Sequence, residues 1–421
     1  MAAPDAHRTV DAVWRIESAR LIAGLARMVH DVGRAEDLAQ EALVAALQQW
    51  PDEGVPENPG AWLMSTAKHR AIDGFRRDDV LRRKVEQLGH ESETAHDPDL
   101  AAQADDDIGD ELLSLIFTAC HPVLSQQARV ALTLRLIGAL TTAEIARAFL
   151  VPEKTMAQRI VRAKRTLAEE GVAIETPSGD DRDARLASVL EVVYAIYNEG
   201  YSATAGEGWM RPALCDDALR LGRMLAELAP AEPEVHGLVA LMEIQSSRTR
   251  ARVGPGGEPI LLLDQDRARW DWMLVRRGLD ALARAEELGD ALGPYALQAA
   301  IAACHARARV ADDTDWDRIA AFYGNLAEVV PSPVVELNRA VAVSMAAGPA
   351  AGLELVEVLV AGGALDHYHL LPSVRGDFLM KLGRREEARA EFERAAAMTQ
   401  NERERTLLTT RAQEAAVPGA A

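Results

Sequence analysis

The segment from residue 140 to residue 167 has the side chains of a nucleic-acid contact. Thr141 and Glu144 are spaced as a reciprocal capping box at the start of a first helix, and Pro152 marks the start of a second. The second helix has an apolar stripe at helical spacing, formed by Met156, Ile160, Ala163 and Leu167. Its other face holds donors for base edges and phosphates, namely Lys154, Thr155, Gln158, Arg159, Arg162 and Arg165. This pattern predicts a helix-turn-helix, although an ordinary solvated helix can also have a basic face.

Two segments nearer the N-terminus have polar faces of opposite charge. Trp62–Arg83 has six basic and three acidic residues, a local charge of +3. Its side chains for phosphate or unstacked bases are Lys68, His69, Arg70, Arg76 and Arg77. The predicted helix from Glu36 to Trp50 has an acidic and amide-rich face that includes Asp37, Gln40 and Glu41. Taken singly, each segment is also compatible with a solvated helix surface.

The elements that position these residues are predicted to be helices throughout. Alanine, leucine and arginine recur at helical spacing, and aromatic residues make up only 5% of the chain. With 421 residues the chain exceeds the usual size of one hydrophobic core, so several units are expected. Turn residues and charge runs divide it into residues 9–83, an acidic linker at 84–111, residues 112–171, a connection at 172–185 and a helical region at 186–416.

The overall composition excludes several classes of protein. The formal net charge is −19 and neither half is basic, so DNA contact must be local rather than a general electrostatic adsorption. The three cysteines have no Cys-x-x-Cys spacing, which indicates neither a disulfide framework nor a zinc site. No export signal and no apolar run of about 18 residues is present, so we expect a cytoplasmic protein with no membrane contact.

Together the three polar segments resemble, in order and spacing, the extracytoplasmic-function type of the sigma-70 family. The resemblance covers Val10 to about Gly171. It implies that Asp37, Gln40 and Glu41 bind core RNA polymerase at the clamp helices of its large subunit, with a further contact at the flap. The basic segment resembles the region that binds and melts the −10 promoter element, with His69 at a place where the family most often has Asn. The helix-turn-helix resembles the region that binds the −35 element. The expected partners are therefore core polymerase and promoter DNA, with no cofactor, no metal and no catalytic residue.

The remainder of the chain resembles the extension of a sigma subgroup whose C-terminal half is similar to tetratricopeptide repeats. It begins with Tyr194-Ala195-Ile196-Tyr197-Asn198-Glu199-Gly200-Tyr201. The segment from Leu382 to Ala395 has the Gly, Ala, aromatic and Ala pattern of one such repeat. We therefore expect an all-α protein with a region 2 domain, a region 4 helix-turn-helix and a C-terminal array that modulates activity and offers a groove to a protein partner.

Two other hypotheses remain open from the sequence. The first is a helix-turn-helix regulator with a helical sensor domain that binds DNA without polymerase. The second is an enzyme or ligand-binding protein, for which Asp264, Asp266 and Asp271 offer a carboxylate cluster. For that cluster we expect instead ion pairs with neighbouring arginines around Trp270.

Overall fold

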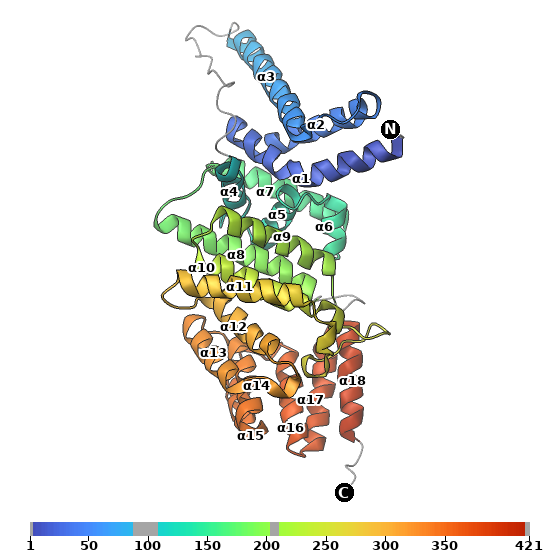
Figure 1. Ribbon diagram of the computed structural model, residues 1–421, viewed down its shortest axis with the longest axis vertical. Coiled ribbons are helices and arrows are strands. Elements are labelled where there is room, and N and C mark those ends of the chain that lie inside the picture. The colour runs from blue at the N-terminus through green and yellow to red at the C-terminus, as the bar shows by residue number, and fades with distance from the viewer. Residues whose placement is uncertain (1–2, 87–107, 203–209, 417–421) are drawn as a thin grey trace. The chain divides into compact units, whose positions relative to one another are not determined.

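The computed structural model describes residues 3–86, 108–202 and 210–416, and within these ranges the chain is built from helices (Figure 1). One isolated bridge pairs Val253 with Pro259, and no β-strand occurs in the described ranges. The chain divides into two compact units, Met1–Val193 and Tyr194–Ala421. The prediction of an all-α fold is confirmed.

The first unit starts with three long helices. These are α1 (Ala3–Val29), α2 (Val32–Glu53) and α3 (Pro59–Glu86). Asp31 caps the start of α2, where its carboxylate accepts a 2.7 Å hydrogen bond from the backbone N–H of Arg34, and Gly54 caps its end. Trp50 near the end of α2 is buried, and its ring meets that of Trp62 on α3 edge to face at 5.4 Å. This aromatic contact joins the helices of the two N-terminal polar segments.

The second group of helices in this unit contains the predicted helix-turn-helix. Its members are α4 (Ile108–Ala119), α5 (Gln126–Leu136), α6 (Thr142–Ala148) and α7 (Glu153–Glu169). α8 (Asp180–Tyr201) begins within the segment expected to be a connection. The first half of α8 packs on this group: Ser188 donates to the Cys120 carbonyl at 2.6 Å, and Arg129 pairs with Glu191 at 3.1 Å. The helix-turn-helix group thus includes the start of the helix that continues into the second unit.

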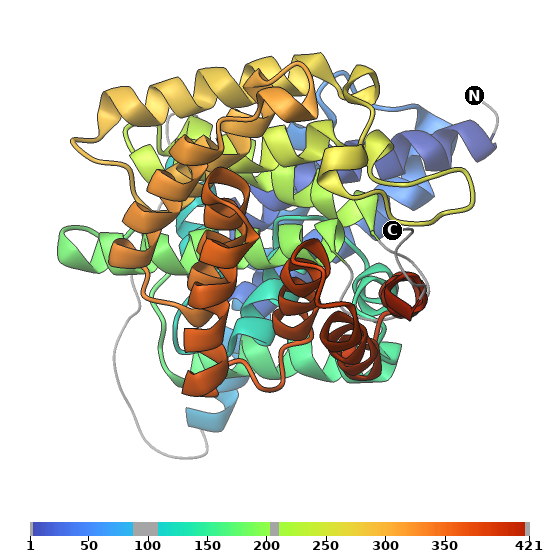
Figure 2. The same cartoon turned by 90° about the horizontal axis from the view of Figure 1, so that it is seen from below.

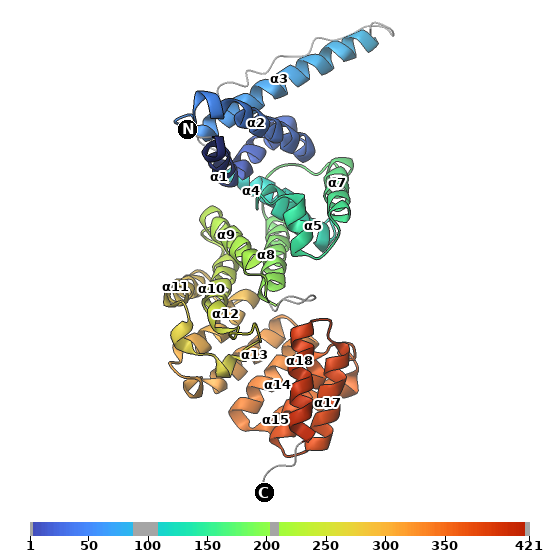
Figure 3. The same cartoon turned by 90° about the vertical axis from the view of Figure 1, so that its right-hand side faces the viewer.

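The second unit is a succession of helices, each packed against its neighbours in the chain (Figures 2 and 3). Its helices are α9 (Pro212–Leu228), α10 (Pro233–Ser247), α11 (Trp272–Leu288), α12 (Pro294–Arg307), α13 (Trp316–Val329), α14 (Pro333–Ala347), α15 (Pro349–Gly362), α16 (Leu370–Lys381), α17 (Arg385–Met398) and α18 (Glu402–Ala416). Short 3₁₀ turns lie at Thr249–Ala251, Leu262–Asp264, Arg267–Arg269 and Ala311–Asp313. Such neighbour-to-neighbour packing is characteristic of helical repeat arrays.

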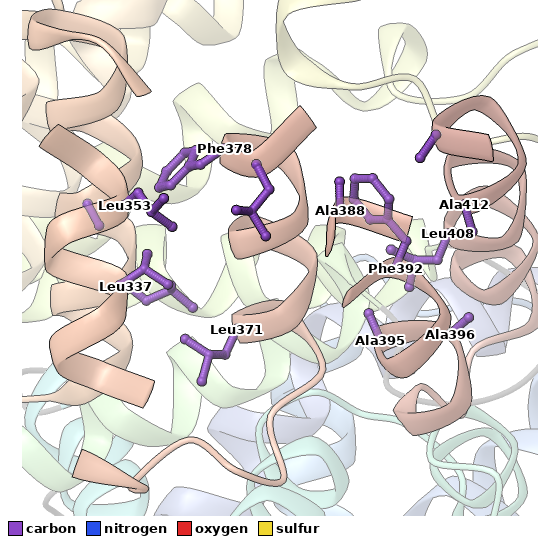
Figure 4. Packing of buried hydrophobic residues seen from close by; sticks show 14 of the residues in the cluster. Leu337, Leu353, Leu371, Phe378, Ala388, Phe392, Ala395, Ala396, Leu408 and Ala412 are labelled. Atoms are coloured by element: carbon purple, nitrogen blue, oxygen red, sulfur yellow. The ribbon is translucent and has the colours of Figure 1, made fainter. Parts of the chain in front are cut away.

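The segment that resembles a tetratricopeptide repeat, Leu382 to Ala395, forms the turn after α16 and most of α17. Gly383 has a positive φ of 77° in the turn between the two helices, a conformation that glycine adopts without steric cost. Figure 4 shows Phe378 of α16 beside Leu353 and Phe392 of α17 beside Leu408. Both phenylalanine rings are almost fully buried, so Phe392, the aromatic position of the pattern, and Phe378 of the preceding helix both stabilise contacts with neighbouring helices.

Candidate nucleic-acid interface

The second helix of the helix-turn-helix has the two faces that its sequence predicts. On α7 the apolar stripe of Met156, Ile160, Ala163 and Leu167 is buried. On the opposite side the exposed residues are Lys154, Thr155, Gln158, Arg162 and Arg165, whereas Arg159 is half-buried. An exposed row of donors on a helix held by its apolar face is suited to lie in a DNA groove, because the donors are free to exchange water for phosphate and base acceptors.

The first helix of the motif is held at its start by the expected capping box. The Thr141 side chain accepts from the Glu144 backbone N–H at 3.1 Å, and the Glu144 carboxylate accepts from the Thr141 backbone N–H at 2.8 Å. This backbone hydrogen bond is the main reason why the pKa of Glu144 lies below its ordinary value. The box satisfies two N–H groups of a helix of only seven residues.

Not every basic side chain on α7 is equally available. Arg165 donates to Glu169 one turn later at 2.7 Å, and both side chains are largely exposed. Lys164 forms an ion pair with Glu36 of α2, and Arg135 of α5 donates to the same carboxylate at 2.6 Å. Glu36 is only 4% exposed and neighbours Asp37, yet sequence analysis did not single it out. It contacts residues about a hundred positions away, so no local pattern could identify it.

The basic segment on α3 presents its side chains unevenly. His69 and Arg76 are exposed and Lys68 and Arg70 are half-buried, while the side chain of Arg77 lies outside the described residues. The Nδ1 atom of His69 lies 2.8 Å from the Ser65 carbonyl, to which it can donate a hydrogen bond. In that arrangement the other ring nitrogen, Nε2, takes no part in this hydrogen bond and can contact a nucleotide.

Phe75 is an additional candidate contact that sequence analysis did not select. Its ring is 45% exposed and it precedes the exposed Arg76 on α3. Exposed aromatic rings beside cationic side chains are platforms for stacking unpaired bases. An aromatic residue on the otherwise polar face of a basic helix was the signal available in the sequence.

The acidic face of α2 meets the basic face of α3. Asp37 and Glu41 are exposed and Gln40 is half-buried. Arg70 of α3 donates to the Glu41 carboxylate at 3.2 Å. Glu41, expected to bind the polymerase, and Arg70, expected to bind DNA, are thus neighbours. Because this ion pair is exposed, it contributes little stability and can exchange for another partner at small cost.

The carboxylates considered for catalysis or metal binding hold helix ends instead. Asp271 accepts from the backbone N–H groups of Met273 and Leu274 at the start of α11, and Asp266 accepts from Ala268 N–H at 2.9 Å. The expectation of Asp–Arg pairs was therefore wrong for Asp266 and Asp271, because both carboxylates accept hydrogen bonds from backbone N–H groups at the start of the adjacent helix or turn. In the described part of the chain no cluster of three metal-ligating side chains occurs.

The fold and this polar surface together define a helical DNA-binding protein with a helix-turn-helix. Residues 16–80 match the family description "Sigma-70 region 2" and residues 114–167 match "Sigma-70, region 4". Residues 185–286 match a family of unknown function (DUF6596). The chain is 43% identical over 383 residues to "Uncharacterized protein R00370" of Rhizobium meliloti (strain 1021). The matched residues cover 90% of this chain and 89% of that protein.

The chain belongs to the sigma-70 family, of the extracytoplasmic-function type, with a C-terminal helical extension. Regions 2 and 4 support a role as an alternative sigma factor in promoter-directed transcription, with core RNA polymerase and promoter DNA as partners. Proteins of this family are initiation factors without enzymatic activity. No helix in the described ranges is both long and apolar enough to span a lipid bilayer.

Proposed function

We propose that this protein acts in the cytoplasm as an alternative sigma factor whose α2 binds the polymerase, whose α3 binds the −10 element and whose α7 binds the −35 element. The observation that supports it best is the exposed donor face of α7 opposite a buried apolar stripe, within a helix-turn-helix held by a capping box. The chain selects the promoter, and the polymerase performs the chemistry.

At the −35 element, Gln158 and Arg162 are the side chains we assign to base recognition. Both are exposed on the donor face of α7. Lys154, Thr155, Arg159 and Arg165 supply phosphate or flanking contacts. Phosphate contacts position the helix and depend on salt concentration, whereas base contacts determine which promoter is bound.

At the −10 element, we assign Lys68, Arg70 and Arg76 to the phosphates and His69 to a base of the opened strand, and Arg77 remains a phosphate contact predicted from the sequence alone. Strand opening unstacks bases, so an aromatic surface beside these cations lowers the cost of keeping a base out of the duplex. Phe75 supplies such a surface in this proposal, since its ring is partly exposed on α3.

At the polymerase, Asp37, Gln40 and Glu41 contact the clamp helices of the large subunit, and the region 4 domain contacts the flap. The exposed carboxylates of Asp37 and Glu41 are suited to a basic surface. Binding there releases Arg70 from Glu41, which makes the guanidinium available to promoter DNA. Polymerase binding and −10 recognition are then linked through one exposed ion pair.

Run-off transcription with purified core polymerase and a promoter library tests this proposal. The double change Asp37→Ala, Glu41→Ala should abolish polymerase-dependent initiation. The matched control is Asp52→Ala, Glu53→Ala, which removes the same charge from exposed positions of the same helix and should leave initiation intact. DNA binding without polymerase, and no initiation with it, would favour the polymerase-independent regulator instead.

Arg162→Ala separates base recognition from phosphate contact. If Arg162 contacts a base, the cognate promoter should lose about 1–3 kcal/mol of binding free energy while promoters altered at that base lose little. An equal loss on all promoters assigns the side chain to a phosphate. The exposed Arg276 of α11 provides a charge-matched control, Arg276→Ala, for which no change is expected.

The C-terminal helical array modulates transcription in this proposal and offers a surface to a protein partner. The supporting observation is that α8 packs on the helix-turn-helix group through Ser188 and Glu191 and continues into the second unit. A chain ending at Tyr201 keeps the whole of α8. If this shortened chain supports the same initiation as the full chain both in vitro and in cells, the array has no modulating role.

A further inference from the structure

The second unit contains a cavity of about 270 Å³ that none of the functions above uses. Its lining comes from the end of α8, from α10 and the residue that follows it, from α12 and α13, and from one 3₁₀ turn: Tyr194, Tyr197, Asn198, Tyr201, Leu241, Gln245, Arg248, Leu262, Gln298, Ile301, Ala302, His305 and Tyr323. Pockets for small organic ligands start at about 300 Å³. The cavity is therefore suited to a small metabolite rather than to a peptide or a nucleotide.

The lining of the cavity has positive charge and no negative charge. Arg248 is the only permanently charged residue among the lining residues, and none of them is a carboxylate. The Arg248 side chain donates through Nη2 to two neutral acceptors, the Tyr201 hydroxyl and the Gln245 amide oxygen. In the described part of the chain it has no ion pair, although the residue is only 9% exposed. A buried cation without a counter-charge is costly, so an anion in the cavity stabilises it.

Arg248 still has donors to offer. A guanidinium has five N–H groups in a planar fork that matches a carboxylate. Within the described residues, Nε and Nη1 of Arg248 make no hydrogen bond. Its guanidinium carbon lies 5.9 Å from the centre of the Tyr201 ring and 5.7 Å from that of Trp270, which is buried. The aromatic rings limit how far the guanidinium can turn away from the cavity.

His305 is a second polar side chain of the lining that can contact a ligand. The residue lines the cavity and is only 8% exposed, and its Nδ1 atom has no hydrogen-bond partner in the described chain. Its ring packs edge to face on Trp316 at 5.1 Å, which holds its orientation. Burial, with Arg248 and Arg267 nearby, lowers the pKa of His305 to about 4, so the ring is neutral at pH 7 and can donate one hydrogen bond without adding charge.

Much of the remaining wall is suited to an apolar body, beside the amide side chains of Asn198, Gln245 and Gln298. Tyr197 and Tyr201 stack with their ring centres 5.7 Å apart, and both hydroxyls already have partners within the protein. These two rings therefore offer mainly their carbon surfaces. Leu241, Ile301 and Ala302 add aliphatic surface to the lining. One cation beside apolar walls favours a monoanion with a small hydrocarbon part over a multiply charged phosphate.

We propose that this cavity binds a small organic monocarboxylate, with the carboxylate on the Arg248 guanidinium and the hydrocarbon body against the carbon surfaces of the stacked tyrosine rings. The site includes the Tyr194–Tyr201 segment, whose polar side chains the sigma role does not use. Binding is a property of the second unit and does not depend on the proposed transcriptional function.

Isothermal titration calorimetry on the full-length protein tests the proposal, with acetate, hexanoate and benzoate as probes and benzamide and inorganic phosphate as controls. Hexanoate or benzoate should bind in a saturable 1:1 manner, and benzamide should bind at least about tenfold more weakly because it has no charge, a difference of about 1.4 kcal/mol. No saturable binding of any carboxylate up to about 10 mM, or equal binding of benzamide, would overturn the proposal.

Two variants locate the binding site. Arg248→Gln should weaken binding at least tenfold, whereas the exposed Arg276→Gln should not change it. Since loss of a buried arginine can affect folding, Gln298→Glu is the second variant: it places a carboxylate on the cavity wall and should also weaken binding tenfold while keeping Arg248. Each variant's melting temperature is measured alongside. Unchanged affinity in a folded Arg248→Gln and in Gln298→Glu would show that the carboxylate binds elsewhere.

Discussion

Gly237→Ala should destabilise the second unit because the backbone of α12 lies directly against this glycine of α10. A Cβ atom at Gly237 would lie 2.6 Å from the backbone nitrogen of Ala296 and 2.9 Å from its Cα. Both atoms belong to the backbone of α12, so no side-chain rotation can make room. The helices must instead move apart.

The magnitude follows from opposing effects. Alanine is better than glycine in a helix interior by about 1 kcal/mol. Overpacking of a tight contact costs about 1–3 kcal/mol. Moving α12 also stretches its cap, because the Glu234 carboxylate of α10 accepts from the N–H groups of Tyr295 at 2.7 Å and Ala296 at 3.1 Å. Hydrogen bonds to a charged group contribute about 1.5–3 kcal/mol, and their partial loss makes the net change a destabilisation of about 1–3 kcal/mol.

The matched control is Gly324→Ala on α13. Nothing lies within 4 Å of a Cβ atom built at Gly324, which is also inside a helix. The same substitution should therefore stabilise the unit by about 0.5–1 kcal/mol. The two variants change the same atoms in the same unit, and only the surroundings differ.

Urea unfolding followed by far-ultraviolet circular dichroism measures both variants on the full chain. Because the chain has two units, the transition that shifts in the Gly324→Ala variant identifies the second unit, and the Gly237→Ala variant is compared on that transition. An upward shift for Gly237→Ala as large as that for Gly324→Ala would refute the argument from close approach. Since α10 and α12 both line the cavity, the same variant should also weaken benzoate binding.

Three further predictions concern a helix cap, a pH dependence and a buried charge. Thr141→Ala should cost the helix-turn-helix about 1 kcal/mol at neutral pH in urea unfolding. The hydrogen bonds that lower the pKa of Glu144 stabilise the folded chain at pH values above the unfolded pKa of about 4.3. This stabilisation is lost as the pH falls through the folded pKa. Glu144→Gln should therefore flatten the acid side of a profile of unfolding free energy against pH. Glu243 is buried between two partly exposed arginines, Arg223 at 2.8 Å and Arg277 at 3.3 Å. Replacing both arginines by alanine should lower the free energy of unfolding by about 3–5 kcal/mol, because it leaves a buried carboxylate unpaired. Glu243→Gln should lower it clearly less. Equal losses of stability in thermal unfolding would contradict this reasoning.

The sequence by itself determined what depends on neighbours three or four residues apart. The all-α fold, the Thr141–Glu144 capping box and the buried stripe of α7 follow from such spacing, because a helix places these residues on one face or in one turn. The order of the three polar segments also sufficed to recognise the sigma-70 family, which the matches to regions 2 and 4 confirm. The roles of the individual contact residues remain predictions.

Only the tertiary structure decided which distant side chains meet. The burial of Glu36 against Arg135 and Lys164 and the pairing of Glu41 with Arg70 depend on how separate helices pack. The cavity around Arg248 likewise needs α8, α10, α12 and α13 together. Helix periodicity states which face of a helix is apolar, but not which other face it meets. That choice depends on side-chain volumes and on the close approaches that residues such as glycine allow, so these sites became visible only in the packed chain.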